Sequence, residues 1–329
     1  MLSTKLKEAA GNVSSAGVNW TAQTDLAIKL SSNTLQCMAW DGSKFVALSN
    51  NGSIATSPDG ITWTKVTLSA PLTSAAFVSV VWSGSLFVAV GYNAGVSAVC
   101  ATSSNGTTWT YQSGLNTAWA VGWNPWPYAV AWNGSLFCAA GPGGKCVTSP
   151  DGITWTSRSG FTTAFTINGV CNAITNNGSL FVAVGYDSST SLNICATSTD
   201  GITWTTRSSF TTASGAAGYN PYDVNWNGSL FCAVGDICLT SPDGITWIKR
   251  NSFTAVSGGV SIESVTWDGS LFCAVGGSGT CVTSSDAVTW TKQSGFTTAF
   301  GSTFAAYAVA SNSSKLVAVG QTGKCATSP

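Results

Sequence analysis

One copy of a repeated sequence motif is split between the two ends of this chain. The complete motif reads Thr-Ser-Pro-Asp-Gly-Ile-Thr-Trp at residues 56–63. Residues 327–329 begin another copy and stop after Thr-Ser-Pro, whereas residues 17–20, Gly-Val-Asn-Trp, supply its second half. A closed ring of repeated units needs such a split, because a strand from the N-terminus then completes the C-terminal unit. The pattern therefore predicts a ring that joins the two ends of the chain.

The repeat has two halves, and each half occurs seven times. The first half reads Trp-Asn-Gly-Ser-Leu-Phe at residues 132–137, and its copies begin at Trp40, Trp82, Trp132, Thr175, Trp226, Trp267 and Ser311. The second half is the motif above, and its tryptophans are Trp63, Trp109, Trp155, Trp204, Trp247, Trp290 and Trp20. Successive motif tryptophans lie roughly 43–49 residues apart, which is typical of a β-propeller blade. We number the blades 1 to 7, starting with the blade of Trp40.

Two tight turns divide each repeat into four expected strands, A to D. In blade 3, strand A ends at Trp132, and the Asn-Gly that follows favours a hairpin to strand B. Strand C carries Cys-x-Thr-Ser, and an Asp-Gly turn leads to strand D, Ile-Thr-Trp-Thr-x-Arg. In blade 7, strands A to C come from about residues 303–328 and strand D from about residues 17–22. We predict an all-β fold, a seven-bladed β-propeller of four-stranded antiparallel blades over residues 13–329, preceded by an N-terminal arm or tail at residues 1–12.

Nine of the eleven cysteines fall on two repeated strand positions. One strand C position holds Cys100, Cys146, Cys195, Cys238, Cys281 and Cys325, and one strand B position holds Cys138, Cys232 and Cys273. Other blades carry valine or isoleucine at these positions, such as Val46 and Ile54, so we expect free thiols in an apolar core. Blades 3, 5 and 6 carry both cysteines, which leaves a cross-strand disulfide there as the alternative. The absence of any Cys-x-x-Cys pair argues against a zinc site.

Composition excludes several classes of function. The chain has 13 basic and 13 acidic residues and no histidine, so no charge pattern favours nucleic acid and the commonest general base is missing. No apolar run is long enough to span a membrane, and the first residues lack the apolar stretch of a secretory signal. We expect no cofactor, no metal, no nucleic-acid partner and no membrane insertion.

The Ser-x-Asp-Gly-x-Thr-Trp segments that begin at Ser57, Ser149, Ser198 and Ser241 resemble the Asp-box (BNR) repeat of sialidase-like β-propellers. They are one residue shorter than the usual box, between Asp and Gly. With the Trp-Asn-Gly-Ser-Leu-Phe halves, the repeat also looks like those of phage and viral virion-surface propellers. The resemblance covers the chain from about residue 13 and implies the fold much more specifically than it implies an activity. The box residues themselves are expected to build the turn.

A sialidase-like site, as the resemblance implies it, needs clustered arginines, a Tyr/Glu pair and an aspartate at the ring centre. The three arginines, Arg158, Arg207 and Arg250, occupy one repeat position on the expected outermost strand, so they should not converge on a ligand. Glu263 and Asp223 stand near the starts of strand A in blades 6 and 5 and could face the channel. We predict that the protein is not an enzyme, with a glycoside hydrolase as the alternative.

Binding should occur where the repeat is broken. Lengthened B–C loops and unusual D–A connections place aromatic side chains after blades 2 and 4. The B–C loops and D–A connections lie on the face of a propeller opposite the tight turns, so we predict two related patches, at the 2/3 and 4/5 blade junctions. Their candidate binding residues are Tyr92, Trp119, Trp123, Asn124 and Trp126 for the first, and Tyr186, Tyr219, Asn220 and Tyr222 for the second. Such aromatics suit sugar or protein binding, and the alternative is that they plug the junctions between blades.

These observations predict a non-enzymatic binding or structural module on the surface of a phage or virus particle, as a fibre, spike or decoration protein. Its expected partners are host-surface glycans or other virion proteins, and it could form oligomers. The alternatives are a stand-alone carbohydrate-binding lectin and a cytoplasmic assembly scaffold, besides the hydrolase.

Overall fold

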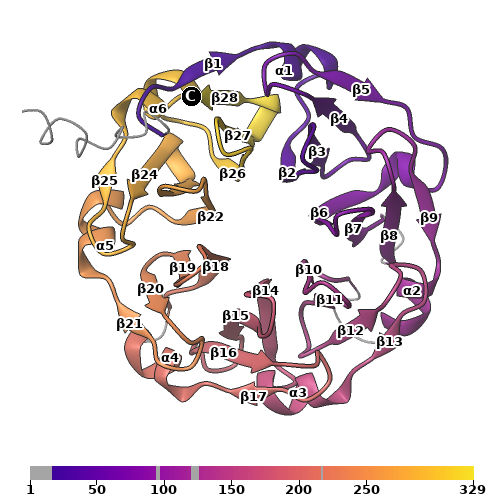
Figure 1. Ribbon diagram of the computed structural model, residues 1–329, viewed down its shortest axis with the longest axis vertical. Helices are drawn as coiled ribbons and strands as arrows, with labels where there is room; N and C mark the ends of the chain where they lie inside the picture. Colours follow the sequence, from indigo (N-terminus) through magenta and orange to yellow (C-terminus); the bar gives the residue numbers. More distant parts are fainter. Residues whose placement is uncertain (1–16, 94–96, 120–125, 216–217) are drawn as a thin grey trace, which may run out of the picture.

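The computed structural model describes residues 17–93, 97–119, 126–215 and 218–329, and these form a seven-bladed β-propeller. Seven four-stranded antiparallel sheets stand around a central opening, with strand A of each sheet innermost (Figure 1). The predicted fold class and number of blades are confirmed. Residues 1–12, the predicted arm or tail, lie outside the described residues.

The strands fall into four concentric layers. The innermost strands A are β2 (Leu35–Trp40), β6 (Ala76–Trp82), β10 (Ala129–Trp132), β14 (Gly169–Asn176), β18 (Pro221–Trp226), β22 (Ile262–Trp267) and β26 (Ala306–Ser311). Strands B are β3 (Phe45–Ser49), β7 (Phe87–Tyr92), β11 (Phe137–Ala140), β15 (Phe181–Asp187), β19 (Phe231–Gly235), β23 (Phe272–Gly276) and β27 (Leu316–Gly320). Strands C are β4 (Ile54–Ser57), β8 (Ala98–Ser103), β12 (Cys146–Ser149), β16 (Asn193–Ser198), β20 (Cys238–Ser241), β24 (Thr280–Ser284) and β28 (Cys325–Ser328). The outermost strands D are β5 (Thr64–Val66), β9 (Thr110–Gln112), β13 (Thr156–Ser157), β17 (Thr205–Thr206), β21 (Ile248–Lys249), β25 (Thr291–Lys292) and β1 (Thr21–Gln23).

Strand β1 closes the ring by pairing with β28, as the split motif predicts. Thr21 lies opposite Thr327, and Ala22 lies opposite Ala326. The backbone N–H of Gly17 donates to the Ser328 hydroxyl at 2.9 Å, which completes the motif across the two ends of the chain. The strand is Thr21–Gln23, later than the predicted residues 17–22, because residues 17–20 form the turn that precedes it.

The Ser-x-Asp-Gly turns are held by their own side chains. In blade 3, the Ser149 hydroxyl accepts the Gly152 N–H at 2.8 Å, and Asp151 Oδ1 accepts the N–H groups of Ile153 and Thr154 at 2.8 and 2.7 Å. Burial raises the pKa of Asp151, but these hydrogen bonds outweigh it, and the net pKa lies below the ordinary value. Since the turn also includes Trp155, the predicted strand D began too early: β13 starts at Thr156. The carboxylates of the turns are therefore structural.

Short helices in the D–A connections form a layer that the sequence analysis missed. They are α1 (Asp25–Lys29), α2 (Gly114–Trp119), α3 (Ser159–Phe165), α4 (Ser208–Ser214), α5 (Asn251–Ser257) and α6 (Ser294–Phe300). The D–A connection after blade 1 holds a 3₁₀ segment instead, η1 (Leu72–Ser74), and two B–C connections hold η2 (Gly277–Gly279) and η3 (Gln321–Gly323). Phe161 of α3 packs edge-on against Trp204 of the next blade, with ring centroids 4.8 Å apart. Phe296 of α6 packs in the same way on Trp20, at 4.7 Å. Each such contact joins one blade to the next.

The cysteines are free and buried, as predicted. Where strands B and C both carry one, the sulfur atoms touch: Cys138 and Cys146 lie 3.3 Å apart, and Cys232 and Cys238 lie 3.7 Å apart. Burial raises the pKa of Cys138, and its neighbour Cys146 raises it further. The thiols therefore act as small apolar side chains between the sheets.

Replacing Gly152 by alanine should lower the free energy of unfolding by about 1–3 kcal/mol. Gly152 has a φ of +72°, and a Cβ there would lie 2.8 Å from Cγ2 of Val88 in the preceding blade. Blade 6 naturally carries Ala287 at this position, with φ +56°. In the preceding blade the residue equivalent to Val88 is Cys232, which lies in the same buried cluster as Ala287 and is smaller than valine. Urea denaturation followed by circular dichroism measures the effect.

Gly134→Ala is the matched control for this prediction. Gly134 has a φ of +101°, and a Cβ there would meet no atom within 4 Å. It therefore reports the backbone cost alone. Equal losses for the two variants would contradict the packing argument.

Candidate functional site

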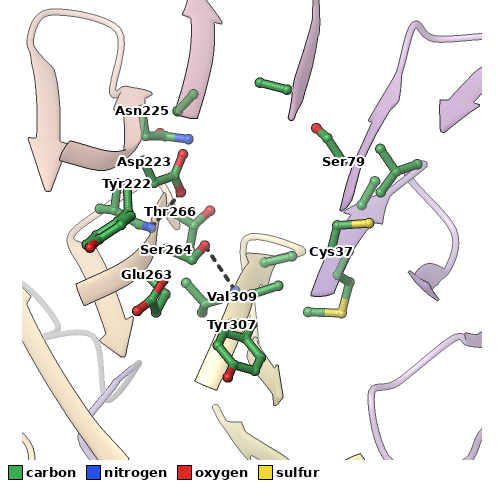
Figure 2. A pocket seen from close by; sticks show the side chains of 18 of the residues that line it. Cys37, Ser79, Tyr222, Asp223, Asn225, Glu263, Ser264, Thr266, Tyr307 and Val309 are labelled. Atoms are coloured by element: carbon green, nitrogen blue, oxygen red, sulfur yellow. Dashed lines mark hydrogen bonds between the residues drawn. The ribbon is translucent and has the colours of Figure 1, made fainter. Parts of the chain in front are cut away.

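The innermost strands of all seven blades line a central channel with a volume of about 670 Å³. In Figure 2, Tyr222, Glu263 and Tyr307 lie toward the end of the channel where their strands begin, and Asp223 and Ser264 lie deeper. The D–A and B–C connections meet at this end, because strand A begins and strand B ends there. We call this end the channel mouth.

In six of the blades, a β-bulge near the start of strand A directs one extra side chain to the channel mouth. In β18 the bulge lies between Pro221 and Asp223, and its extra residue is Tyr222. Gly235 opposite lets the backbone before the bulge come close, since a Cβ on Gly235 would collide with the carbonyl oxygen of Asn220. The residues at this position are Gln36, Val78, Asn172, Tyr222, Glu263 and Tyr307, with Tyr128 at the matching place just before β10. All seven side chains are half-buried and line the channel.

Asp223, the predicted channel carboxylate of blade 5, is tied to the backbone. Its carboxylate accepts the N–H of Val224 and, from the next blade, the N–H of Val265, both at 2.8 Å. Burial inside the ring raises its pKa to about 6, although these hydrogen bonds act in the opposite direction. Between blades 6 and 7, the Ser264 hydroxyl makes the equivalent contact by accepting the Val309 N–H at 3.3 Å. Asp223 therefore joins blades 5 and 6.

Glu263, the predicted carboxylate of blade 6, is half-buried at the channel mouth. Among the residues that the structure describes, no lysine or arginine forms an ion pair with Glu263. The salt bridge in that part of the chain joins Lys44 and Asp41, in the turn between β2 and β3. Burial and the nearby carboxylate of Asp236 raise the pKa of Glu263 to about 7. The carboxylate that acts on Glu263 is therefore Asp236, from the B–C connection of blade 5.

The three arginines do not gather at the channel. Each one follows the last residue of its strand D and precedes a helix, so it lies one residue beyond the strand on which we predicted it. Arg158 Nε donates to the Thr148 hydroxyl at 2.7 Å, and Arg207 and Arg250 make the same bond to Thr197 and Thr240. Their common role is to fasten the outer edge of a blade.

Aromatic side chains from three successive blades gather on the face of the channel mouth. The rings of Tyr92, from blade 2, and Trp126 stack with centroids 4.5 Å apart and an interplanar angle of 25°. Burial raises the pKa of Tyr128, and the nearby hydroxyls of Tyr186 and Tyr92 raise it further, which places these groups close together. All four side chains are half-buried. We call Tyr92, Trp126, Tyr128 and Tyr186 the aromatic cluster.

Hydrogen bonds in the loops hold this cluster in place. Asp187, next to Tyr186, accepts the Thr166 hydroxyl at 2.7 Å and the Ser189 N–H at 2.8 Å. Burial raises the pKa of Asp187, but its hydrogen bonds lower it to about 2. After Tyr92, the backbones of Asn93 and Ser97 bond at 3.1 Å. The described backbone next to Tyr92 and Tyr186 is therefore held by hydrogen bonds.

The other predicted binding residues are distributed differently from the two expected patches. Trp119 is 2% exposed and ends α2 in the core, so it does not reach the surface. Tyr219 is 38% exposed, and Lys249 Nζ lies 5.0 Å from its ring centroid. The Asn220 N–H donates to Asp236 at 3.0 Å, and Tyr222 lines the channel. Trp123 and Asn124 lie outside the described residues.

Tyr128, Tyr307 and Asp236 belong to the channel mouth and were not among the predicted site residues. The sequence holds a signal for two of them: aligning the starts of strand A places Tyr128, Tyr222 and Tyr307 at one repeat position. For Asp236 the sequence holds no such signal, because its place beside Glu263 depends on how two blades pack.

The raised pKa values of Glu263 and Asp223 predict that stability falls as the pH rises toward neutrality. Between the ordinary value of 4.5 and about 7, folded Glu263 keeps a proton that the unfolded chain has released. The free energy of unfolding therefore falls with rising pH in this window, by up to about 3 kcal/mol for each of the two groups. Urea denaturation at about pH 5 and about pH 8 measures it. Glu263→Gln should reduce the fall and be the more stable protein at the higher pH, and an unchanged slope would contradict the prediction.

Comparisons with known proteins identify the fold alone. No family model matches the sequence, and no curated protein matches it. Ycf48 from Cyanidioschyzon merolae has a similar structure, with a TM-score of 0.68 and 15% identity over 94% of this chain and 98% of that chain. Ycf48 bound to D1 peptide has a TM-score of 0.68 and 16% identity, over 94% of this chain and 96% of that chain. Catalytically inactive virginiamycin B lyase from Staphylococcus aureus, with quinupristin, has a TM-score of 0.71 and 10% identity, over 94% of this chain and 98% of that chain. All are similar as seven-bladed rings.

No helix among the described residues is both long and apolar enough to cross a membrane. No group of three or more His, Cys, Asp or Glu side chains in that part of the chain is arranged to hold a metal ion.

Proposed function

We propose that this protein is a non-enzymatic binding module that holds a glycan on its aromatic cluster. The observation that carries the proposal is the stacked pair of Tyr92 and Trp126, half-buried beside Tyr128 at the channel mouth. Aromatic rings offer large flat apolar surfaces at little cost in conformational entropy, and they cover the apolar face of a pyranose ring. The hydrogen bonds of Asp187 hold the backbone beside Tyr186, so this part of the cluster needs little ordering on binding.

The arrangement of charged groups supports binding without catalysis. The carboxylate of Asp223 accepts two backbone N–H groups, and the arginines are hydrogen-bonded at the outer edges of their blades. A glycoside hydrolase needs two carboxyl groups on either side of the scissile bond. Glu263 and Asp236 instead come from adjacent blades and lie close enough for Asp236 to raise the pKa of Glu263.

The surface of a phage or virus particle is the setting that we propose for this module. Its support is the resemblance of the two repeat halves to Asp-box propellers of virion surfaces. Seven-bladed rings of similar structure hold other kinds of ligand, a D1 peptide in Ycf48 and quinupristin in virginiamycin B lyase. The ring is thus a scaffold whose loops determine the ligand.

A glycan array probed with the labelled protein tests the proposal. We expect binding to a restricted set of glycans, with no release of sugar from the best of them on prolonged incubation. Failure to bind any glycan at micromolar protein concentration would contradict the glycan assignment. Release of sugar that disappears in Glu263→Gln would instead show a hydrolase.

A further inference from the structure

Three side chains from successive blades form a distinct part of the channel mouth. Tyr222, Glu263 and Tyr307 occupy the same bulge position in β18, β22 and β26, which are neighbours in the ring. Figure 2 shows Glu263 between the two tyrosines in that view. All three line the channel and are half-buried, so they are accessible to a small group that enters the mouth.

The two tyrosines are held in place by polar neighbours. The Tyr307 hydroxyl accepts a hydrogen bond from Gln321 Nε2 at 3.1 Å. Burial raises the pKa of Tyr222, whose hydroxyl lies close to Asn220 and Ser261. The rings therefore form fixed walls on either side of Glu263.

The carboxylate of Glu263 has no ion-pair partner among the residues that the structure describes. Lysines in this region lie over aromatic rings instead, with Lys324 Nζ 4.6 Å from the ring centroid of Phe304. Asp236 adds a second carboxylate, fixed by the Ser261 hydroxyl at 2.6 Å. An ionised, half-buried carboxylate beside another one is costly unless it takes up a proton or a cation binds to it.

We propose that Tyr222, Glu263 and Tyr307 form a binding site for an organic ammonium group. The carboxylate of Glu263 supplies the counter-charge, and the tyrosine rings supply apolar and cation–π contact, the combination that recognises alkylammonium ions elsewhere. The channel behind the site, at about 670 Å³, has room for the attached chain. This site is separate from the aromatic cluster, and the inference does not rest on the proposed glycan.

Calorimetric titration with two matched probes tests the site. Choline carries a quaternary ammonium group, and 3,3-dimethylbutan-1-ol is its uncharged carbon analogue. At about pH 8, where Glu263 is ionised, choline should bind with a Kd in the millimolar range, at least about ten-fold more tightly than the analogue. A lysine amide acetylated on its α-amino group, used as a third probe, shows whether a primary ammonium on a peptide is also accepted.

Variants locate the binding. Glu263→Gln should weaken choline binding by about ten-fold or more, because it keeps the shape of the side chain and removes the charge. Ile202→Ala, an exposed residue of a Ser-x-Asp-Gly turn on the opposite face, should leave binding unchanged. Equal binding of choline and its analogue, an unaffected Glu263→Gln variant of native circular dichroism, or no choline binding at about 10 mM would each overturn the proposal. None of these results would affect the glycan assignment, which rests on other side chains.

Discussion

Replacing Trp20 by alanine should destabilise the whole propeller, lowering the free energy of unfolding by about 3–5 kcal/mol. Trp20 is 8% exposed, packs edge-on against Phe296 of α6, and donates from Nε1 to the Gly17 carbonyl at 2.8 Å. It also precedes β1, the strand that completes blade 7. Its loss should therefore leave a cavity at the one junction where the chain closes on itself. Urea denaturation followed by circular dichroism measures the change.

Two variants control this prediction. Trp63→Ala removes the equivalent tryptophan of blade 1 and should cost a similar amount, since Trp63 is buried and makes the same bond, to the Gly60 carbonyl. Val18→Ala lies on the same N-terminal segment as Trp20, but Val18 is 45% exposed, so it should change stability by less than about 0.5 kcal/mol. If Trp20→Ala behaved like Val18→Ala, the ring would not be closed by the N-terminal strand.

Replacing Trp126 by alanine should weaken binding of the best array glycan by about ten-fold or more. The substitution removes one ring of the stacked pair with Tyr92 and exposes the space beside Tyr128 to water. Central aromatic contacts of this kind typically contribute about 2 kcal/mol or more to a binding site. Calorimetric titration of the wild type and the variant with the same glycan measures the difference.

The same Ile202→Ala variant serves as the control for Trp126→Ala. Ile202 is 45% exposed and belongs to a Ser-x-Asp-Gly turn, on the face opposite the aromatic cluster. It should bind the glycan as the wild type does. Loss of binding in Ile202→Ala with full binding in Trp126→Ala would place the ligand on the wrong face for our account.

The sequence was sufficient to predict the ring because its signals are local and repeated. The Asn-Gly and Asp-Gly turns need residues with positive φ, and the tryptophan spacing sets the blade length. The split motif at Trp20 then specified the closing strand. The short helices were missed although Phe161, Ala164 and Phe165 have helical spacing, because a four-stranded blade does not require them.

The candidate site was less predictable, because it depends on how blades pack. Trp119 and Trp126 both belong to the aromatic segment after blade 2. Trp119 nevertheless lies in the core, whereas Trp126 stacks on Tyr92. Tyr186 was assigned to a different patch from Tyr92, whereas Tyr128 lies close to both in the structure. Nor does sequence spacing show that Asp223 accepts the Val265 N–H of the next blade. Such contacts join residues far apart in the chain.

Hydrogen–deuterium exchange with and without the best array glycan tests most directly which face of the propeller binds. We predict slower exchange in the peptides that carry Tyr92, residues 126–128 and Tyr186, with the Ser-x-Asp-Gly turns, such as residues 149–155, unchanged. Slower exchange confined to those turns would contradict our account, because the ligand would then occupy the opposite face of the ring.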